Sequence, residues 1–258
     1  MNKMTENNIS SRVGTIYLSR PEKRNALHPQ MVSELKQTFQ EFRDDDSVKI
    51  IVLRGRGDVF CAGADLSVIK ALKTATYEEN HADSKSLAEL FDLIYTCPKP
   101  VIAAVHGHAI AGGCGLATIC DIIIASDEAK FGYTETRIGF VPAIVAQFLI
   151  RKTGQAAARH LLLSGSLIDA KEAEKIGLIT KSVKAGAFEE ELQKLLHTLL
   201  EKTSGEALQA TKLLINEVSD LSYKEAIEHA ITINAKARGS KDCQRGIEAF
   251  LNKTKIIW

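Results

Sequence analysis

The sequence has 258 residues, of which 45% are hydrophobic and 25% are charged, an ordinary balance for a globular protein. Its formal net charge of +1 excludes an overall field that would attract nucleic acid or a membrane surface. Five cysteines without a C-x-x-C pair argue against a disulfide framework or zinc site and favour a reducing compartment. The polar start, MNKMTENNIS, lacks the apolar core of a signal peptide, and no apolar run reaches the ~20 residues of a membrane span. We therefore expect a cytoplasmic protein without membrane contact.

The first two thirds of the sequence alternate predicted strands and helices. Apolar runs or alternating patterns predict strands over 12–19, 50–54, 101–105 and 122–125. Helical spacing of apolar residues predicts helices over 29–43, 66–73, 77–96, 142–152, 155–164 and 170–176. Residues 1–8 are expected to be irregular, and residues 74–76 to form a surface break that is a candidate mobile lid. This alternation is typical of an α/β core.

The last third of the sequence is predicted to be almost wholly helical. The expected helices cover 188–201, 205–218, 223–237 and 243–252. No low-complexity segment or linker separates this part from the rest. We therefore expect one structural unit, with a core over residues 1–190 that carries the site and a helical region over residues 191–258.

Two turns rich in glycine and alanine follow two of the predicted buried strands. The sequence FCAGADL (60–66) follows the strand at 50–54, and HGHAIAGGCG (106–115) follows the strand at 101–105. Backbone without bulky side chains lets N–H groups approach a ligand closely. We expect the N–H groups of Ala64 and Gly112 to hold together an oxygen on which negative charge develops.

Four blocks of sequence resemble the crotonase family of enoyl-CoA hydratases and isomerases. They are RPEKRNAL (20–27), FCAGADL (60–66), GHAIAGGCGLA (107–117) and FGYTETRIGF (131–140), in the family's order and at its usual spacing. The resemblance extends from about Ile9 to the C-terminus. It implies an α/β fold, a spiral of ββα turns, with a C-terminal helical region that forms a homotrimer, often paired into a hexamer. The charged oxygen would then be that of a coenzyme A (CoA) thioester.

The resemblance also implies one proton-transferring carboxylate. Members of the family usually carry two glutamates, one three residues after the oxyanion glycine and one in the block that begins Phe-Gly. Here the first position is Gly115, which has no side chain, and the second is Glu135. If Glu135 acts near neutral pH, partial burial is expected to raise its pKa.

A single carboxylate leaves more than one function open. Syn addition of water can take both H and OH from one water molecule, whereas moving a double bond needs only one base, so the chemistry alone leans towards an isomerase. The combination of GGCGL and TETRIGFVPA resembles methylglutaconyl-CoA hydratases, which favours a hydratase acting on a branched or glutaconyl-type chain. A different class is a non-catalytic member that binds a CoA ester or RNA, although the segment 85–99 has too few basic residues to support RNA binding.

The remaining site predictions also come from the resemblance. CoA would be bound by residues of the first two blocks, namely Lys23, Arg24, Ala26, Ala62, Asp65 and Leu66. Phe250 and Lys253 would contact the adenine and phosphate of CoA bound to a neighbouring subunit, and Phe140, Val141 and Ile144 are candidate walls of the acyl pocket. His106 and His108 lack a third ligand for a metal. We expect no metal and no cofactor, since CoA is part of the substrate.

Overall fold

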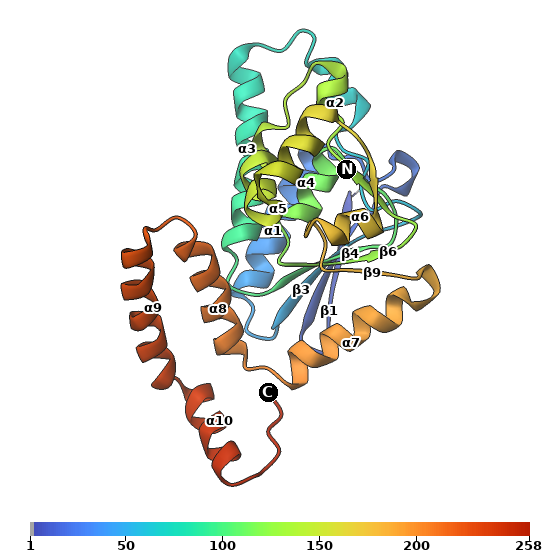
Figure 1. Ribbon diagram of the computed structural model, residues 1–258. Coiled ribbons are helices and arrows are strands. Elements are labelled where there is room, and N and C mark those ends of the chain that lie inside the picture. The colour runs from blue at the N-terminus through green and yellow to red at the C-terminus, as the bar shows by residue number, and fades with distance from the viewer. Residues whose placement is uncertain (1–2) are drawn as a thin grey trace.

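The computed structural model of the chain describes residues 3–258 (Figure 1). At its centre lies a six-stranded sheet in which neighbouring strands follow the order β1-β2-β3-β4-β6-β9. The pair β1–β2 is antiparallel, and the other pairs of this sheet are parallel. Its strands are β1 (Thr5–Ser10), β2 (Val13–Leu18), β3 (Ile50–Gly55), β4 (Val101–Val105), β6 (Ile122–Ser126) and β9 (Lys181–Val183).

Both faces of this sheet are covered, which explains the continuous apolar sequences of its inner strands. All five residues of β4 are buried. Val101, Ala103 and Val105 belong to the main hydrophobic cluster, whereas Ile102 and Ala104 belong to a second cluster on the opposite face. Alternate residues of one strand therefore contribute to two separate packing layers.

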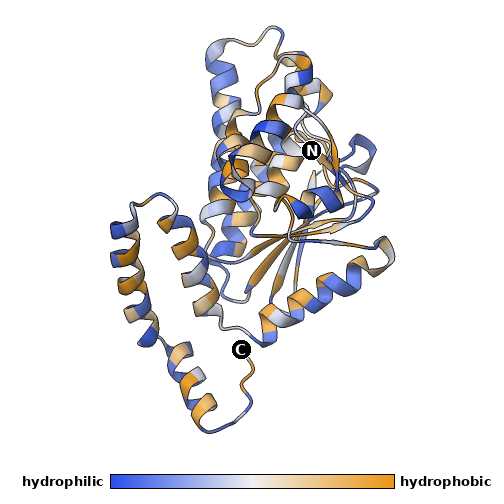
Figure 2. Ribbon diagram, in the orientation of Figure 1, coloured by the Kyte–Doolittle hydropathy of each residue, from blue (hydrophilic) through white to orange (hydrophobic). Residues whose placement is uncertain are grey.

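Helices form the two layers that cover the sheet. Figure 1 shows α1, α3, α4 and α5 on one side of the sheet and α7 on the other. The bounds of these helices are α1 (Pro29–Asp44), α3 (Tyr77–Thr96), α4 (Gly112–Thr118), α5 (Ala143–Ser164) and α7 (Phe188–Glu201). Figure 2 shows hydrophobic residues concentrated along the strands between these layers. Two short helices, α2 (Leu66–Ala71) and α6 (Ala170–Lys175), complete the core.

A second, smaller sheet joins the two glycine-rich turns. It contains β5 (Ala109–Ile110), β7 (Lys130–Gly132) and β8 (Ile168–Asp169) in that order. An isolated bridge links Cys61 to Ala109, and another links Leu27 to Ala64. The segments around residues 27, 61–64 and 109–112 are therefore held side by side by main-chain pairing.

The last three helices form an arm that extends away from the core. They are α8 (Gly205–Val218), α9 (Tyr223–Arg238) and α10 (Lys241–Leu251), and Figure 1 shows them at one edge of the molecule. Lys212 of α8 fastens the arm to the core, because its ammonium donates to the carbonyl oxygens of Ile94 and Lys99 and lies 2.8 Å from the Asp121 carboxylate. The division expected at residue 190 falls inside α7, a helix that packs on the sheet.

Most of the predicted elements are confirmed, and two details differ. Residues 1–8 were expected to be irregular, but β1 begins at Thr5, because the Glu34 carboxylate accepts hydrogen bonds from the backbone N–H groups of Met4 and Thr5. The two helices expected over 142–152 and 155–164 form the kinked helix α5, whose Gly154 has a φ of 76°. Among residues 3–258, none of the helices combines the length and apolar character needed to cross a membrane.

Candidate active site

A cavity of about 670 Å³ opens between the two glycine-rich turns and helices α1, α2 and α3. Ala62, Ala64, Ala111 and Gly112 line it from the two turns, and Glu135 lines it from the segment that follows β7. The rest of its wall is mostly aliphatic, from Leu27 and Val32 beside the first turn to Val68 and Ile69 of α2 and Leu72 just after it. This is a concave, mainly apolar site with a few convergent polar groups, as is typical of small-molecule sites.

The two turns approach each other closely enough to share one ligand atom. A β-carbon placed on Gly63 would lie 2.9 Å from the β-carbon of Ala111 and 3.6 Å from the backbone nitrogen of Gly112. The φ of Gly63 is 91°, a conformation that side chains disfavour. Glycine at position 63 therefore meets both a conformational and a steric requirement of this contact.

The N–H groups of Ala64 and Gly112 are available to a ligand. The N–H of Leu27 donates to the carbonyl of Gly63, and the carbonyl of Leu27 accepts from the N–H of Asp65. These two bonds flank Ala64 and do not use its N–H. Gly112 is the first residue of α4, where an N–H has no partner within the helix. Within the described range 3–258, neither N–H donates a hydrogen bond.

Ala111 holds a strained backbone conformation directly before Gly112. Its φ is 50° and its ψ is −128°, a region that residues other than glycine rarely occupy. Two bonds fix it there, because its N–H donates to the carbonyl of Gly132 at 2.7 Å and its own carbonyl accepts from Gly115 at 3.0 Å. Strain of this kind concentrates at functional sites, and here it fixes the direction of the neighbouring Gly112 peptide.

Glu135 supplies a carboxylate in the cavity with unused hydrogen-bonding capacity. It begins a short 3-10 helix, η2 (Glu135–Ile138), and its backbone carbonyl accepts from Phe140 at 3.0 Å. The side-chain atom Oε2 is buried and makes no hydrogen bond to any residue of the described chain. Burial raises the pKa of this carboxyl above its usual value. A carboxylate with these properties can accept a proton and return it.

Gly115, the expected position of a second glutamate, lies outside the cavity wall. Gly115 is fully packed within α4. A β-carbon there would lie 3.1 Å from the ring of Phe91 and 3.4 Å from a methyl group of Val145. The space next to this position is therefore filled by apolar side chains.

The residues predicted to bind CoA have different surroundings. Ala62 lines the cavity, and its N–H donates to the carbonyl of Arg24. The side chains of Lys23 and Arg24 are exposed, whereas Ala26 is buried. The structure thus brings the backbone of the 23–26 loop to the edge of the cavity and leaves its two cations in solvent.

Asp65 and Leu66 lie where the first turn (60–66) leads into α2. The Asp65 carboxylate lies 2.9 Å from the Arg20 guanidinium. Asp65 also caps α2, because its carboxylate accepts hydrogen bonds from the N–H and the hydroxyl of Ser67. These hydrogen bonds lower the pKa of Asp65 to about 2. Its charge is therefore already engaged by the protein, while the Leu66 side chain is exposed.

Phe250 and Lys253 lie on the arm, at the end of the molecule away from α2 and α3 (Figure 1). The Phe250 side chain is 82% exposed.

Of the three candidate pocket walls, Phe140 and Ile144 line the cavity and Val141 does not. The ring nitrogens of His106 and His108 contact the backbone of Gly57 and Lys130, respectively. The part of the chain that the structure describes contains no group of three potential metal ligands.

Sequence reasoning missed the polar wall that α3 contributes. Asn80, Asp83, Ser84 and Leu87 line the cavity from one helix face. Their spacing of three, four and seven residues is the sequence signal that they share this face. The sequence does not show which structure that face meets, because α3 has an exposed side as well.

Comparisons with known proteins agree with this architecture. The family model described as enoyl-CoA hydratase/isomerase matches residues 8–258, and the chain belongs to this family. A Thermus thermophilus protein whose name assigns it to the enoyl-CoA hydratases is 40% identical over 241 residues, which cover 93% of this chain and 95% of that protein. The crotonyl-CoA hydratase of Syntrophomonas wolfei is 35% identical over 250 residues, covering 95% and 93% of the two chains.

Solved structures of the family share the fold over the whole chain. The crystal structure of an enoyl-CoA hydratase from Mycobacterium smegmatis has a TM-score of 0.94 at 28% identity, covering 100% of this chain and 99% of that one. An enoyl-CoA hydratase from Shewanella pealeana has a TM-score of 0.93 at 29% identity, covering 99% and 96%. The crotonase-type α/β fold with a helical C-terminal region is thereby confirmed.

Proposed function

We propose that the protein is an enoyl-CoA hydratase that adds water across the C2=C3 double bond of an enoyl-CoA thioester. One observation carries this proposal: two free backbone N–H groups, of Ala64 and Gly112, line the same cavity as the buried, unpartnered oxygen of Glu135. The names of the relatives support water addition as the reaction.

The arrangement fits the charge changes of this reaction. Glu135 takes a proton from water while the hydroxide adds to C3, and the electron pair of the double bond moves through C2 to the thioester oxygen. The N–H groups of Ala64 and Gly112 stabilise the resulting enolate, a contribution of about 3 kcal/mol for each donor. Glu135 then returns the proton to C2, so that one water molecule is added and the carboxylate is regenerated. No cofactor besides the CoA of the substrate takes part in this scheme.

The packing around Gly115 favours a second candidate, a Δ3,Δ2-enoyl-CoA isomerase. With Phe91 and Val145 beside this position, the site has no second carboxylate from α4. A single base at Glu135 can remove a proton from C2 of a 3-enoyl thioester and return it to C4. The oxygen and the two N–H groups have the same roles in both reactions.

Ultraviolet absorbance of the conjugated enoyl thioester separates the two reactions. Purified protein is mixed with a panel of 2-enoyl-CoA esters in one set of cuvettes and with a 3-enoyl-CoA ester in another. We expect the absorbance of the 2-enoyl esters to fall as water adds. A rise with the 3-enoyl ester and no change with the others would identify an isomerase, and no change in either set would contradict both reactions.

The acyl chain is the finer part of the proposal. The sequence resemblance to methylglutaconyl-CoA hydratases favours a branched or glutaconyl-type chain, and straight chains are open as well. A glutaconyl-type chain ends in a carboxylate, with or without a methyl branch, whereas a simple straight or branched chain does not, so these chains differ in charge. The panel of esters therefore includes both types.

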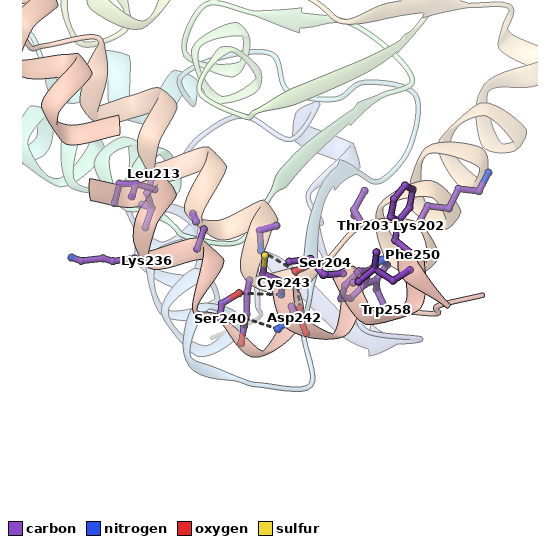
Figure 3. Close-up of a pocket in the computed structure, with 18 of the residues that line it drawn as sticks. Lys202, Thr203, Ser204, Leu213, Lys236, Ser240, Asp242, Cys243, Phe250 and Trp258 are labelled. Carbon is purple, nitrogen blue, oxygen red and sulfur yellow. Dashed lines mark hydrogen bonds between the residues drawn. The ribbon is translucent and has the colours of Figure 1, made fainter. Parts of the chain in front are cut away.

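We also propose that the protein assembles into trimers, or dimers of trimers, through the arm. Large hydrophobic side chains are exposed along α8, α9 and α10, namely Ile215, Tyr223, Ile227, Ile231, Ile247, Phe250 and Leu251. A groove of about 920 Å³ runs among these helices, and Figure 3 shows Leu213, Phe250 and Trp258 among its lining residues. Monomeric proteins rarely expose such large apolar surfaces to solvent.

Light scattering tests this assembly. The expected mass is three or six times the 28.2 kDa of one chain. Phe250→Asp should lower that mass and weaken CoA binding, since Phe250 and Lys253 would contact CoA in a neighbouring subunit. A wild-type protein of monomeric mass would refute the proposal.

A further inference from the structure

The cavity that holds Glu135 has negatively charged side chains and no permanent cation. Its ionisable lining residues are Asp83, Glu135 and His28. Across residues 3–258, no lysine or arginine belongs to its lining. The Nδ1 atom of His28 accepts the hydrogen bond that caps α1. The wall thus offers neutral hydrogen-bonding groups, such as Asn80 and Ser84, but no lysine or arginine to neutralise an anion.

Asp83 has no partner that would neutralise it. It takes part in no hydrogen bond or ion pair with the described residues of the chain. Lys36 lies 3.0 Å from the Glu89 carboxylate, and Lys70, Lys73 and Lys85 do not line the cavity. Asp83 is exposed to solvent and also lines the cavity, so its unpaired charge acts, partly screened by water, on a group that enters beside α3.

In the proposed binding mode, the acyl end of the substrate would lie on the side of the cavity formed by α3. The CoA end is expected at the 23–26 loop, next to Ala62. The thioester oxygen would lie between Ala64 and Gly112, with Glu135 next to the reacting carbons. The wall that α3 contributes consists of Asn80, Asp83, Ser84, Ser86 and Leu87, whereas Ile138, Phe140 and Ile144 line the cavity from the segments that follow Glu135. An acyl chain that extends from Glu135 towards α3 meets Asp83.

We propose that Asp83 is a specificity-determining residue that excludes acyl chains ending in a carboxylate, so that the substrate is an uncharged enoyl-CoA. This inference rests on the proposed function, because it assumes that a CoA thioester occupies the cavity. A terminal carboxylate would face Asp83 and Glu135 with no lysine or arginine to pair with, and like charges brought together in this way oppose binding. A straight or branched chain without a terminal carboxylate therefore fits, and a glutaconyl-type chain does not.

Binding of two unreactive thioesters tests the proposal directly. Glutaryl-CoA and its terminal methyl ester have nearly the same shape and differ by one negative charge. Isothermal titration calorimetry with the wild-type protein should give an affinity at least tenfold higher for the methyl ester. In Asp83→Asn that ratio should shrink at least fivefold, because binding of glutaryl-CoA improves while binding of the ester changes little.

A matched control separates the local effect from the change in net charge. Asp92 lies nine residues after Asp83 on α3, which places it on the opposite face of the helix, and it is exposed and does not line the cavity. Asp92→Asn removes the same charge and should leave the ratio at its wild-type value.

The outcomes distinguish the inference from the proposed function. Equal affinity of the wild-type protein for the two thioesters, or an unchanged ratio in Asp83→Asn, overturns the role of Asp83 and leaves the hydratase proposal intact. If neither thioester binds, CoA-ester recognition itself is wrong and both proposals are refuted. Hydration rates of glutaconyl-CoA and its methyl ester should follow the same order as the binding ratios.

Discussion

The ring of Phe91 lies 3.1 Å from the point where a β-carbon on Gly115 would stand. This contact disfavours a large side chain at position 115, since Phe91 is almost fully buried and would have to shift to make room. Apolar packing thus fills the place where the sequence resemblance implied a second glutamate, and α4 contributes no carboxylate to the cavity.

Gly115→Glu should therefore fail to install a second carboxylate. The added side chain must displace Phe91 and Val145 or bury a charge among them, and either change costs about 2 kcal/mol or more of unfolding free energy. Urea denaturation measures this loss. Gly115→Ala is the control, because it adds only the β-carbon and gains about 1 kcal/mol of helix propensity, which offsets part of the crowding. A Gly115→Glu protein as stable as Gly115→Ala would contradict this explanation.

Glu135→Gln should lower turnover at least a hundredfold while CoA-ester binding stays close to wild type, since the amide cannot take the proton. Unchanged turnover would show that another group is the base.

Glu135→Gln should also raise the unfolding free energy at neutral pH. The folded-state pKa of Glu135 is raised by burial, so its ionised form destabilises the fold above that pKa, and this penalty disappears as the pH falls below the unfolded value. The stability gain should be present at pH 7 and absent near pH 4.

The pH profile of the wild-type protein provides a separate prediction. If ionised Glu135 is the base, kcat/KM should fall as the pH drops through the raised pKa, and the midpoint should lie above the usual value for a glutamate. Rates measured between pH 4 and pH 9 with one 2-enoyl-CoA ester locate this midpoint. A midpoint at or below the value of a solvent-exposed glutamate would mean that burial does not tune the group.

Gly63→Ala should impair activity more than stability. Its β-carbon would press on Ala111 at 2.9 Å and force a φ of 91° on a non-glycine residue, which costs about 1–3 kcal/mol. Displacement of the adjacent Ala64 N–H should lower turnover by about a hundredfold. Gly186→Ala is the matched control, since nothing lies within 4 Å of its β-carbon position. Normal turnover in Gly63→Ala would remove the Ala64 N–H from the proposed site.

Lys212→Met should destabilise the attachment of the arm. It breaks the contact with Asp121 and leaves the carbonyl groups of Ile94 and Lys99 without their buried donor. We expect a loss of about 3 kcal/mol, with faster hydrogen exchange in α8. Lys194→Met removes an exposed lysine that pairs with Glu190 and Glu191, and it should change stability little. Equal effects of the two changes would show that the buried contact has no special role.

The two glycine-rich turns could be located from local residue types, because a strand followed by residues without bulky side chains can be recognised in a short stretch of chain. Glu135 could not be singled out in this way, and it was predicted only through the family resemblance of the Phe-Gly block. In the structure Ala64, Gly112 and Glu135 line one cavity.

Features that depend on contacts between distant segments were not predictable. β1 has the polar sequence TENNIS and owes its position to pairing with β2 and to the Glu34 carboxylate. The strands β5, β7 and β8 have two or three residues each, too few to show any periodicity. The position of Asp83 in the cavity wall likewise follows only from the packing of α3 beside α2 and the two turns.

Asp65 both pairs with Arg20 and caps α2. Its low pKa distinguishes two effects of acid on this protein, loss of structure and loss of the catalytic base. Its bonds to Arg20 and Ser67 connect the loop before α1 to the start of α2, and its pKa of about 2 keeps these bonds charged in all but strong acid. Their contribution to stability is present above the unfolded pKa of an aspartate and is lost as the pH falls through about 2. Glu135, in contrast, gains its proton at a much higher pH. In mild acid the bonds of Asp65 therefore remain in place while Glu135 becomes protonated and cannot act as a base. Activity should return as soon as the pH is restored.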